Sequence, residues 1–379
     1  MKKASTLAVI ALVCGITLTA CSPAGTTGGS DTEANLDTAA VDEAKAAVAT
    51  ASGPTDEWFG PDSAPAPTAD KLIVCVEYTA QDITATTWCD GAEEGAAAIG
   101  WRYTRISSQS TADSNRTALQ QAIALNPDGI VTSLDAASNL GLLEEASNAG
   151  IQIVGIHSAA VPGPAPDLFL FTNLTYEPQA QAAMMANLAI ADSNGTARLI
   201  VVTDTQYAIA KAKADSAQAQ IETCSSCEFL EYVSTPAGST NADMPGLFTS
   251  WVQKYGDKPF YVYSVSDAGF FDPGVSALRV GGVEPSGRVG LLGSDGSPAA
   301  YKRITDGEYE IGTIPEPARM QGWQAVDEFN RAFNGEDPSG FVQPLHIITK
   351  DNVATDITAD GIYEPAVDYA AKYTSIWGR

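Results

Sequence analysis

The chain has 379 residues, 45% of them hydrophobic, and a formal net charge of −25 at pH 7. This is enough apolar material for one large domain or for two domains of ordinary size. A surface as acidic as this repels nucleic acid and anionic lipid headgroups, which argues against both as partners.

The first 21 residues have the pattern of an export signal. Two lysines follow Met1, residues 7–18 are apolar, and small residues precede Cys21. The apolar run is too short to cross about 30 Å of hydrocarbon, so we predict a signal peptide over residues 1–20 rather than a membrane span. The sequence Leu-Thr-Ala-Cys resembles a bacterial lipobox, which implies a lipid on the Cys21 thiol. The protein would then be an extracytoplasmic lipoprotein, held on the outer face of the cell membrane by that lipid alone; the alternative is an ordinary secretory signal with a chance cysteine.

Residues 21–70 are rich in Ala, Thr, Gly, Pro, Asp and Ser. They contain one short helix-permissive piece, Thr38–Thr50, and a proline-rich run at 61–67. We predict a flexible tether that lifts the folded part from the membrane. Trp58 and Phe59 are the residues within it that could dock on the folded body.

From Lys71 onward, short apolar runs alternate with helical stretches. The predicted strands are Leu72–Glu77, Trp101–Ser107, Gly129–Leu134, Ile151–Ile156, Leu168–Thr172, Ala197–Thr203, Phe229–Ser234, Pro259–Val265, Arg288–Gly293 and Glu310–Ile314. The predicted helices are Thr86–Gly100, Ser114–Leu125, Ser138–Ala149, Glu177–Ser193, Tyr207–Thr223, Pro245–Tyr255, Asp272–Gly281 and Met320–Asn334. Apolar strands separated by helices are typical of parallel sheets covered on both faces.

The pattern starts again in the second half, so the predicted fold class is α/β with two doubly wound parallel-sheet lobes. Residues 71–173 plus 317–344 form the first lobe in this prediction, and residues 174–316 plus 345–379 form the second. The crossing segments near Asn173, Pro315 and Leu345 are the predicted hinge.

Four cysteines remain after Cys14 leaves with the signal and Cys21 takes the lipid: Cys75, Cys89, Cys224 and Cys227. An even number in an exported chain favours disulfides, with three possible connectivities. Local pairing of the last two is favoured, and it leaves Cys75 with Cys89 across the first loop of the fold. A redox-active pair at Cys224-Ser-Ser-Cys227 and a zinc site are the alternatives. The chain has only two histidines, His157 and His346, so no metal and no cofactor is expected.

Ligands of open α/β sheets lie beyond the carboxyl ends of the strands. The polar residues predicted at those ends define a candidate ligand site between the lobes, and no catalytic residue is among them. These residues are Asp82, Thr84, Asp135 and His157 in the first lobe, Tyr207, Asp267 and Asp295 in the second, and Glu316 where the chain passes back between lobes.

Several stretches over residues 71–352 together resemble one known family. They are Asp90-Gly91-Ala92-Glu93-Glu94, Asn126-Pro127-Asp128-Gly129-Ile130-Val131, Ala149-Gly150-Ile151-Gln152-Ile153-Val154, Gly293-Ser294-Asp295-Gly296-Ser297-Pro298 and Ile348-Thr349-Lys350-Asp351-Asn352-Val353. In this order they resemble the ribose-like sugar-binding branch of the type 1 periplasmic-binding-protein family. That resemblance implies a monomeric solute receptor of an ABC importer, which closes around a small molecule and docks on a membrane permease.

The resemblance also implies roles for individual residues. The family's Gly-Phe-Asp-Gly aspartate falls on Asp295, its Asn-Asp pair on Ser266-Asp267, its hinge glutamine near Glu316, and its second-lobe arginine near Lys213. The chain departs from the family in two places. The loop that stacks aromatic rings on the sugar is Asp82-Ile83-Thr84-Ala85 here, and the Asp-Arg pair after the fourth strand is His157-Ser158. Trp88, Tyr207 and Phe270 are the candidates to replace the lost ring.

The charges of the candidate residues indicate the kind of ligand. Asp82, Asp135, Asp267, Asp295 and Glu316 oppose only Lys213 and a neutral His157. Such an excess disfavours phosphate or carboxylate ligands and suits a neutral polyol or a cation. We therefore predict a lipid-anchored substrate-binding protein for a carbohydrate-like solute. A sensory or quorum-signal receptor would use the same cleft. An extracellular hydrolase is the weakest alternative, because the chain lacks a Gly-x-Ser-x-Gly motif and has little histidine.

Overall fold

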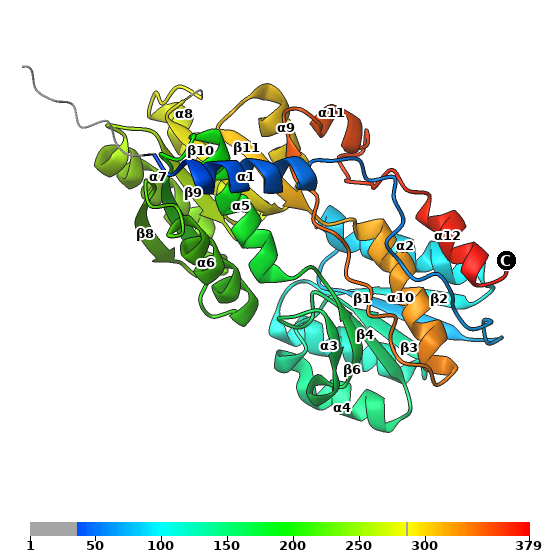
Figure 1. The fold of residues 1–379 in the computed structure, drawn as a ribbon. Coiled ribbons are helices and arrows are strands. Elements are labelled where there is room, and N and C mark those ends of the chain that lie inside the picture. Colours follow the sequence, from blue (N-terminus) through cyan, green and yellow to red (C-terminus); the bar gives the residue numbers. More distant parts are fainter. Residues whose placement is uncertain (1–35, 286) are drawn as a thin grey trace, which may run out of the picture. The chain divides into compact units, whose positions relative to one another are not determined.

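Two six-stranded sheets organise the chain in the computed structural model, which describes residues 36–285 and 287–379 (Figure 1). The predicted signal peptide, residues 1–20, and the predicted lipidation site Cys21 lie outside the described residues. The strand order is β2-β1-β3-β4-β6-β5 in the first sheet and β12-β11-β10-β9-β7-β8 in the second. Neighbouring strands are parallel except for β5 beside β6 and β12 beside β11.

The strands carry the apolar runs that the sequence predicts. In the first sheet they are β1 (Leu72–Glu77), β2 (Arg102–Ser107), β3 (Gly129–Thr132), β4 (Gln152–Ile156), β5 (Gly163–Ala165) and β6 (Leu170–Leu174). In the second they are β7 (Arg198–Thr203), β8 (Glu228–Ser234), β9 (Phe260–Ser264), β10 (Val289–Asp295), β11 (Glu310–Pro315) and β12 (Ile348–Thr349). The two antiparallel edge strands, β5 and β12, are too short to leave a pattern and were not predicted.

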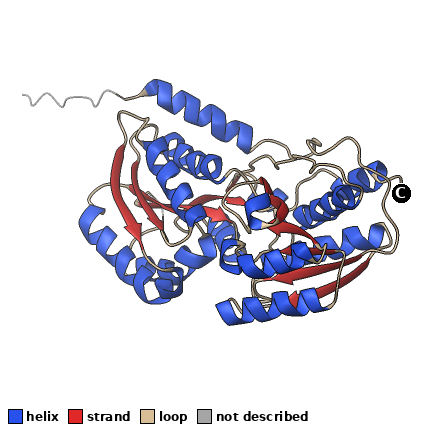
Figure 2. Ribbon diagram, turned by 90° about the horizontal axis from the view of Figure 1, so that it is seen from below, coloured by secondary structure: helices blue, strands red, loops and turns tan. Residues whose placement is uncertain are grey.

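Helices cover both faces of each sheet (Figure 2). Those around the first sheet are α2 (Ile83–Ala98), α3 (Ala112–Ala124), α4 (Leu140–Asn148), α10 (Ala318–Phe333) and α12 (Tyr369–Ile376). Those around the second are α1 (Thr38–Ala51), α5 (Pro178–Asp192), α6 (Ala208–Ile221), α7 (Thr240–Tyr255), α8 (Asp272–Val280), α9 (Pro298–Asp306) and α11 (Val353–Asp356). This arrangement confirms the predicted fold class, because strands buried on both faces need apolar side chains throughout.

Three segments carry the chain between the lobes. Residues 175–177 join β6 to α5, residues 316–317 join β11 to α10, and residues 334–347 join α10 to β12. The first two contact each other, since the Tyr176 hydroxyl donates to the Pro315 carbonyl at 2.8 Å. They lie where the sequence predicted the hinge.

The segment predicted as a flexible tether is packed where the structure describes it. Helix α1 lies along α5 (Figure 1) and buries Val41, Ala44 and Ala51 in the second-lobe core. Trp58 packs against Phe341 and Tyr373 of the first lobe, with ring centroids 6.0 and 5.1 Å away. The tether prediction is therefore wrong for residues 36–70. The composition of this segment is typical of a linker, but its alanines let α1 pack closely on α5. Residues 36–67 therefore form a strap that contacts both lobes.

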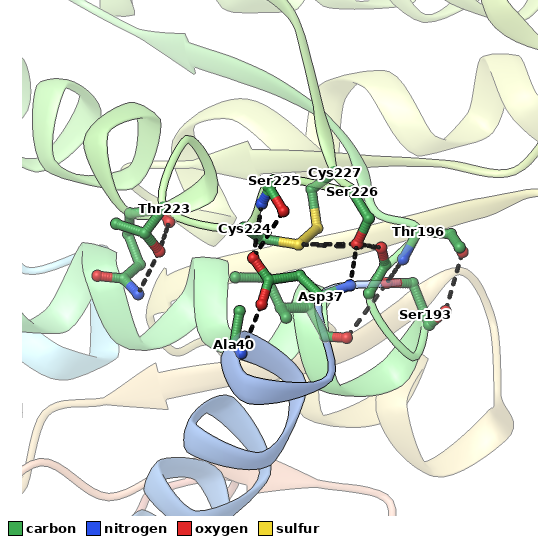
Figure 3. The surroundings of a disulfide bond; sticks show 12 residues. Asp37, Ala40, Ser193, Thr196, Thr223, Cys224, Ser225, Ser226 and Cys227 are labelled. Atoms are coloured by element: carbon green, nitrogen blue, oxygen red, sulfur yellow. Dashed lines mark hydrogen bonds between the residues drawn. A yellow bond between two sulfur atoms is a disulfide. The ribbon is translucent and has the colours of Figure 1, made fainter. Parts of the chain in front are cut away.

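Both ends of this strap, residues 36–67, are held by hydrogen bonds. At its start, Ser225 donates its backbone N–H and its hydroxyl to Asp37 Oδ2 at 3.0 and 2.8 Å, beside the Cys224–Cys227 disulfide (Figure 3). At its far end, Arg331 and Asn330 of α10 donate to the carbonyls of Ser63 and Pro65.

The C-terminal tail also differs from the prediction, which placed residues 345–379 in the second lobe. Helix α12 packs on α10 of the first lobe. Trp377 stacks on Trp323 at 5.8 Å and donates its indole N–H to Asp327 Oδ1 at 2.7 Å. The tail meets the strap on the way, since the Val367 N–H donates to the Thr55 carbonyl at 2.9 Å.

The favoured cysteine pairing is confirmed: Cys75 bonds to Cys89, and Cys224 bonds to Cys227. The first bridge joins β1 to α2, and the second closes the turn between α6 and β8. Among the described residues there is no cluster of three or more potential metal ligands. Within the same residues, no helix has the length and apolar character that a membrane crossing requires.

Candidate functional site

A cavity of about 710 Å³ lies between the carboxyl ends of the two sheets. Five of the predicted site residues line it: Asp82, Thr84, His157, Asp295 and Glu316. The other lining residues are Tyr78, Thr79, Gln81, Ile83, Trp88, Ser110, Ser266, Ala268, Asp272, Gly296, Ser297, Pro298 and Ala299. The wall is therefore shared by both lobes, as the prediction of a site between them requires.

The loop after β1 brings Asp82 to the first-lobe wall. Asp82 is the N-cap of α2, and its Oδ1 accepts the N–H groups of Thr84 at 2.8 Å and Ala85 at 3.3 Å. The Tyr78 hydroxyl donates to its other oxygen. Burial, together with the Asp82 charge, raises the pKa of Tyr78, so the phenol stays a donor. Asp82 thus holds the loop in shape while it faces the cavity.

His157 follows β4 in the left-handed backbone region, with φ of 55°. Its ring stacks on Trp88 with centroids 5.5 Å apart, and its Nε2 lies 3.1 Å from Glu316 Oε1. Burial alone would lower the pKa of His157, but the attraction and hydrogen bond of Glu316 outweigh burial and raise it. The contact with Glu316 therefore shifts the His157 ring toward its cationic form, an effect that was not predicted from the sequence.

Glu316 connects this histidine to the crossing segment. Its side chain is 1% exposed, and Gln321 Nε2 donates to its Oε2 at 2.6 Å. The Gln321 carbonyl oxygen in turn accepts the Trp88 indole N–H at 2.6 Å. A closed chain of contacts thus links α2, the end of β4, the crossing segment and α10 at one side of the cavity.

Asp295 is presented by a tight turn at the end of β10. Its φ of 74° and that of Gly296, also 74°, lie in the left-handed region. A Cβ at Gly296 would lie 2.2 Å from the Tyr301 hydroxyl, so the turn requires glycine there. Asp295 Oδ1 accepts from Lys213 Nζ at 2.8 Å and from Gln181 at 3.4 Å. Its side chain remains 34% exposed toward the cavity side.

Asp267 and Lys213 support this turn from behind and do not line the cavity. Asp267 is fully buried, and its Oδ2 accepts the Gly296 N–H at 2.9 Å. Lys213 is 4% exposed and reaches the site only through Asp295. The prediction that these two residues contact a ligand directly is therefore corrected: both position Asp295 and its turn.

Three other predicted residues lie away from the cavity wall. Asp135 caps a turn, where its Oδ1 accepts the Ser138 N–H at 2.7 Å. Tyr207 is 52% exposed at the start of α6, and Phe270 belongs to the second-lobe core. Of the proposed replacements for the lost aromatic ring, Trp88 lines the cavity, although its ring is covered by His157.

Sequence reasoning missed Tyr78, Ser110, Asp272 and Ser297 as wall residues. Asp272 follows the π-helical turn Asp267–Phe271, and Arg303 of α9 donates to it. Its position at the start of α8, in the segment that follows β9, was the available signal. Ser110 comes from the loop after β2, whose approach to the β1 loop depends on the fold.

Pairing reduces the acidic excess that the sequence analysis expected in the cleft. Lys213 pairs with Asp295, His157 with Glu316, and Arg303 with Asp272. Burial raises the pKa of Asp267 well above its ordinary range, which favours the neutral acid. Three of the four acidic wall residues thus have a cationic partner, and Asp82 is the fourth. The wall carries less negative charge than predicted, which suits an uncharged ligand.

A family model described as a periplasmic binding protein domain matches residues 73–337. The chain therefore belongs to the periplasmic-binding-protein family, and its fold is the type 1 fold of that family. Solved structures with this fold include components of ABC transporters. A comparison with curated proteins gave no match.

Solved structures share the fold at low identity. A sugar-binding protein of a sugar ABC transporter from Bacillus halodurans is 17% identical, with a TM-score of 0.67 over 75% of this chain and 99% of that one. A periplasmic ribose ABC transporter structure from Conexibacter woesei is 18% identical, with a TM-score of 0.64 over 78% and 96%. An ABC transporter solute-binding protein from Agrobacterium vitis with bound allitol is 17% identical, with a TM-score of 0.63 over 75% and 97%.

Proposed function

We propose that this protein is the lipid-anchored, extracytoplasmic substrate-binding protein of an ABC importer and that it binds a neutral sugar or polyol between its two lobes. The single observation that carries this is the cavity of about 710 Å³ at the facing strand ends, lined from both lobes. Its partners are then a small solute and a membrane permease, with no nucleic acid and with the membrane touched only through a lipid on Cys21.

The wall chemistry supports an uncharged, hydroxyl-rich ligand. Hydroxyl groups of Thr79, Thr84, Ser110 and Ser297 both donate and accept, and Asp295 offers a partly exposed carboxylate. Hydrogen bonds to charged groups contribute about 1.5–3 kcal/mol each. Three or four of them, after the costs of association, account for micromolar affinity, about −8 kcal/mol. One structural neighbour holds allitol, which is a polyol of this chemistry.

Closure follows from the position of the cavity. A ligand that contacts both lobes binds the closed state more tightly than the open one. The fraction of closed protein then rises by no more than this difference in binding free energy allows. The crossing segments 175–177, 316–317 and 334–347 are the proposed hinge. Glu316 belongs to one of them and also lines the cavity, so a bound solute would contact the hinge directly.

A thermal-shift screen tests the ligand class. The panel holds pentoses, hexoses and polyols together with sugar phosphates, amines and nucleosides. A solute at 100 times its dissociation constant stabilises the folded protein by about 2.7 kcal/mol, which a melting curve resolves. We expect a neutral sugar or polyol to give the largest shift. That shift should persist in Asp135→Asn, which lies off the wall, and should fall in Asp295→Asn. A panel in which no neutral solute shifts the melting temperature contradicts the proposal.

The anchor has a separate test. Expressed in a bacterium with labelled fatty acid, the full chain should take up label and sediment with membranes, whereas Cys21→Ser should do neither. An unlabelled wild-type protein would overturn the lipid anchor and leave the solute-binding proposal standing.

A further inference from the structure

A cluster of buried ionisable side chains lies behind the turn that presents Asp295. Asp267 is 0% exposed, Glu310 3% and Arg303 6%. They come from the π-helical turn after β9, the start of β11 and helix α9, and Asp272 of α8 completes the group. Asp272 also lines the cavity, so the cluster connects the second-lobe core to the ligand wall.

The hydrogen bonds of this cluster leave two carboxyl oxygens without a donor. Asp267 Oδ2 accepts from the Gly296 N–H at 2.9 Å and from the Thr313 hydroxyl at 2.6 Å, and Glu310 Oε2 accepts from Arg303 Nε at 2.5 Å. The remaining oxygens, Asp267 Oδ1 and Glu310 Oε1, are buried and find no N–H or other hydroxyl donor among the described residues. Each of these two carboxyl groups affects the pKa of the other, so they lie in one electrostatic cluster. Ionised carboxylates only accept, so two unpartnered oxygens in one buried cluster are best satisfied when one of the two carboxyls carries a proton that it donates to the other.

The surroundings keep water away from this contact. A Cβ at Gly293 of β10 would lie 1.4 Å from Asp267 Oδ1, so the carboxyl packs directly on the strand backbone. Three carboxyl groups share the one guanidinium of Arg303. With all of them ionised the cluster would hold two uncompensated negative charges, which burial makes costly. One shared proton halves that excess.

We propose that Asp267 and Glu310 share one proton at neutral pH, and that the resulting neutral carboxyl is the positioning group for the cavity turn at residues 295–297. Its role in solute binding rests on the proposed function; the shared proton itself does not. Asp267 does not touch the ligand in this account. It acts through the Gly296 N–H, which it holds, and through the turn that aims Asp295.

The charged and titratable groups facing Asp267 agree with this assignment. Burial is the largest cause that raises its pKa, followed by the charge and hydrogen bond of Glu310, while Thr313 and Arg303 oppose the rise. The charged and titratable groups around it on the packed elements are Glu310, Arg303, Asp272, Asp295, Tyr263 and Tyr301. Both tyrosine pKa values are raised, chiefly by burial, so both phenols stay neutral.

Asp267→Asn provides the test, because an amide has the shape of the protonated acid. Its NH₂ donates to Glu310, and its oxygen accepts from Gly296 and Thr313. The unfolding equilibrium constant is measured by urea denaturation from about pH 5 to about pH 8. The folded wild type keeps a proton that the unfolded chain releases, so rising pH favours unfolding of the wild type. Asp267→Asn has no such proton and therefore lacks this contribution to the pH dependence. The ratio of wild-type to variant unfolding constants should rise with pH, by at most about tenfold per unit for one proton.

Two further variants and a control sharpen the result. Glu310→Gln should reduce the pH dependence as Asp267→Asn does, and the double variant should add little, because a single proton is removed once. Asp167→Asn, at an exposed carboxylate of the first lobe, should leave the ratio flat. A ratio for Asp267→Asn that does not change with pH overturns the shared proton.

The positioning role has its own readout, the hydrogen exchange of the Gly296 amide. We expect the amide to stay protected in Asp267→Asn and to exchange at least about tenfold faster in Asp267→Ala, where the acceptor is lost. Unchanged protection in a folded Asp267→Ala overturns the positioning role, and loss of protection in Asp267→Asn does so as well. Neither measurement uses a solute, so failure to bind sugars and failure of this inference are distinguished.

Discussion

At the scale of single residues, the cavity is built from side chains that satisfy one another before any ligand arrives. Asp82 caps α2, Asp295 pairs with Lys213, and Glu316 pairs with His157. Each is held at a fixed place by a partner within the protein, and Lys213 does so from behind the wall. Such preorganisation lowers the ordering cost of binding, which is why a modest set of hydrogen bonds suffices for the proposed affinity.

The His157–Glu316 pair predicts a pH-dependent stability. Because the folded pKa of His157 is raised, the pair's full contribution is present below the unfolded value, about 6.5, and is lost as pH rises through the folded value. His157→Phe keeps a ring against Trp88 but leaves Glu316 buried and unpaired. We expect it to lower the free energy of unfolding by about 3 kcal/mol near pH 6, and by less near pH 9.

Urea denaturation at several pH values measures this difference. The double variant His157→Phe/Glu316→Gln is the control, since the neutral amide removes the stranded charge and can still accept from Gln321. It should recover part of the lost stability. Equal losses for His157→Phe at both ends of the pH range would show that the pair is not ionic.

At the scale of elements, the first cleft loop is braced by a covalent link. The Cys75–Cys89 bridge joins β1 to α2, on either side of the loop that carries Asp82 and Thr84. Its cysteines are 14 residues apart, against 3 for Cys224–Cys227. Loop-closure entropy then predicts that removing the first bridge by two serine substitutions costs about 3 kcal/mol, and removing the second about 1.6 kcal/mol. Paired denaturation curves check the order, and a larger loss at the second bridge would contradict it.

The strap gives a second prediction at this scale. Trp58 packs between Phe341 and Tyr373, whereas its neighbour Phe59 is 57% exposed. Trp58→Ala should lower the free energy of unfolding by about 2–3 kcal/mol, and Phe59→Ala should change it by less than about 0.5 kcal/mol.

Hydrogen exchange locates the effect of Trp58→Ala. Exchange should accelerate in residues 52–67, where the strap leaves the second lobe and reaches the first, and should stay unchanged in β7 and β9 of the second-lobe core. Equal exchange in wild type and variant over residues 52–67 would show that Trp58 does not hold the strap.

Elements with strong patterns were predictable from the sequence, and short or context-dependent ones were not. The buried strand Leu72–Glu77 and the amphipathic α3 follow from composition alone. The alanine-rich α1 was recognised as helix-permissive but not as packed, because its apolar face is made of small residues that only a partner helix reveals. Helix α9 was missed because its polar residues follow directly on the Asp295 turn.

At the scale of the whole molecule, the sequence predicted which edge of each sheet carries the site but not the depth of each residue there. The strand-end rule predicted Asp295 and His157 as site residues, and both line the cavity. The same rule could not tell that Asp267 lies beneath the turn, because burial depends on how β9, β10 and β11 stack around Gly293. The pairing of His157 with Glu316 was not predicted for the same reason, since Glu316 reaches the histidine only through the crossing segment.

Calorimetric titration of one sugar and its phosphate tests the central claim most directly. The sugar is the one that gives the largest thermal shift, and both compounds are titrated into the same wild-type protein at one ionic strength. Because Asp272, Asp295 and Glu316 already have cationic partners and Asp82 keeps the wall acidic, the account predicts micromolar binding of the free sugar and weaker binding of its phosphate. Tighter binding of the phosphate, or no heat from either compound, would contradict it.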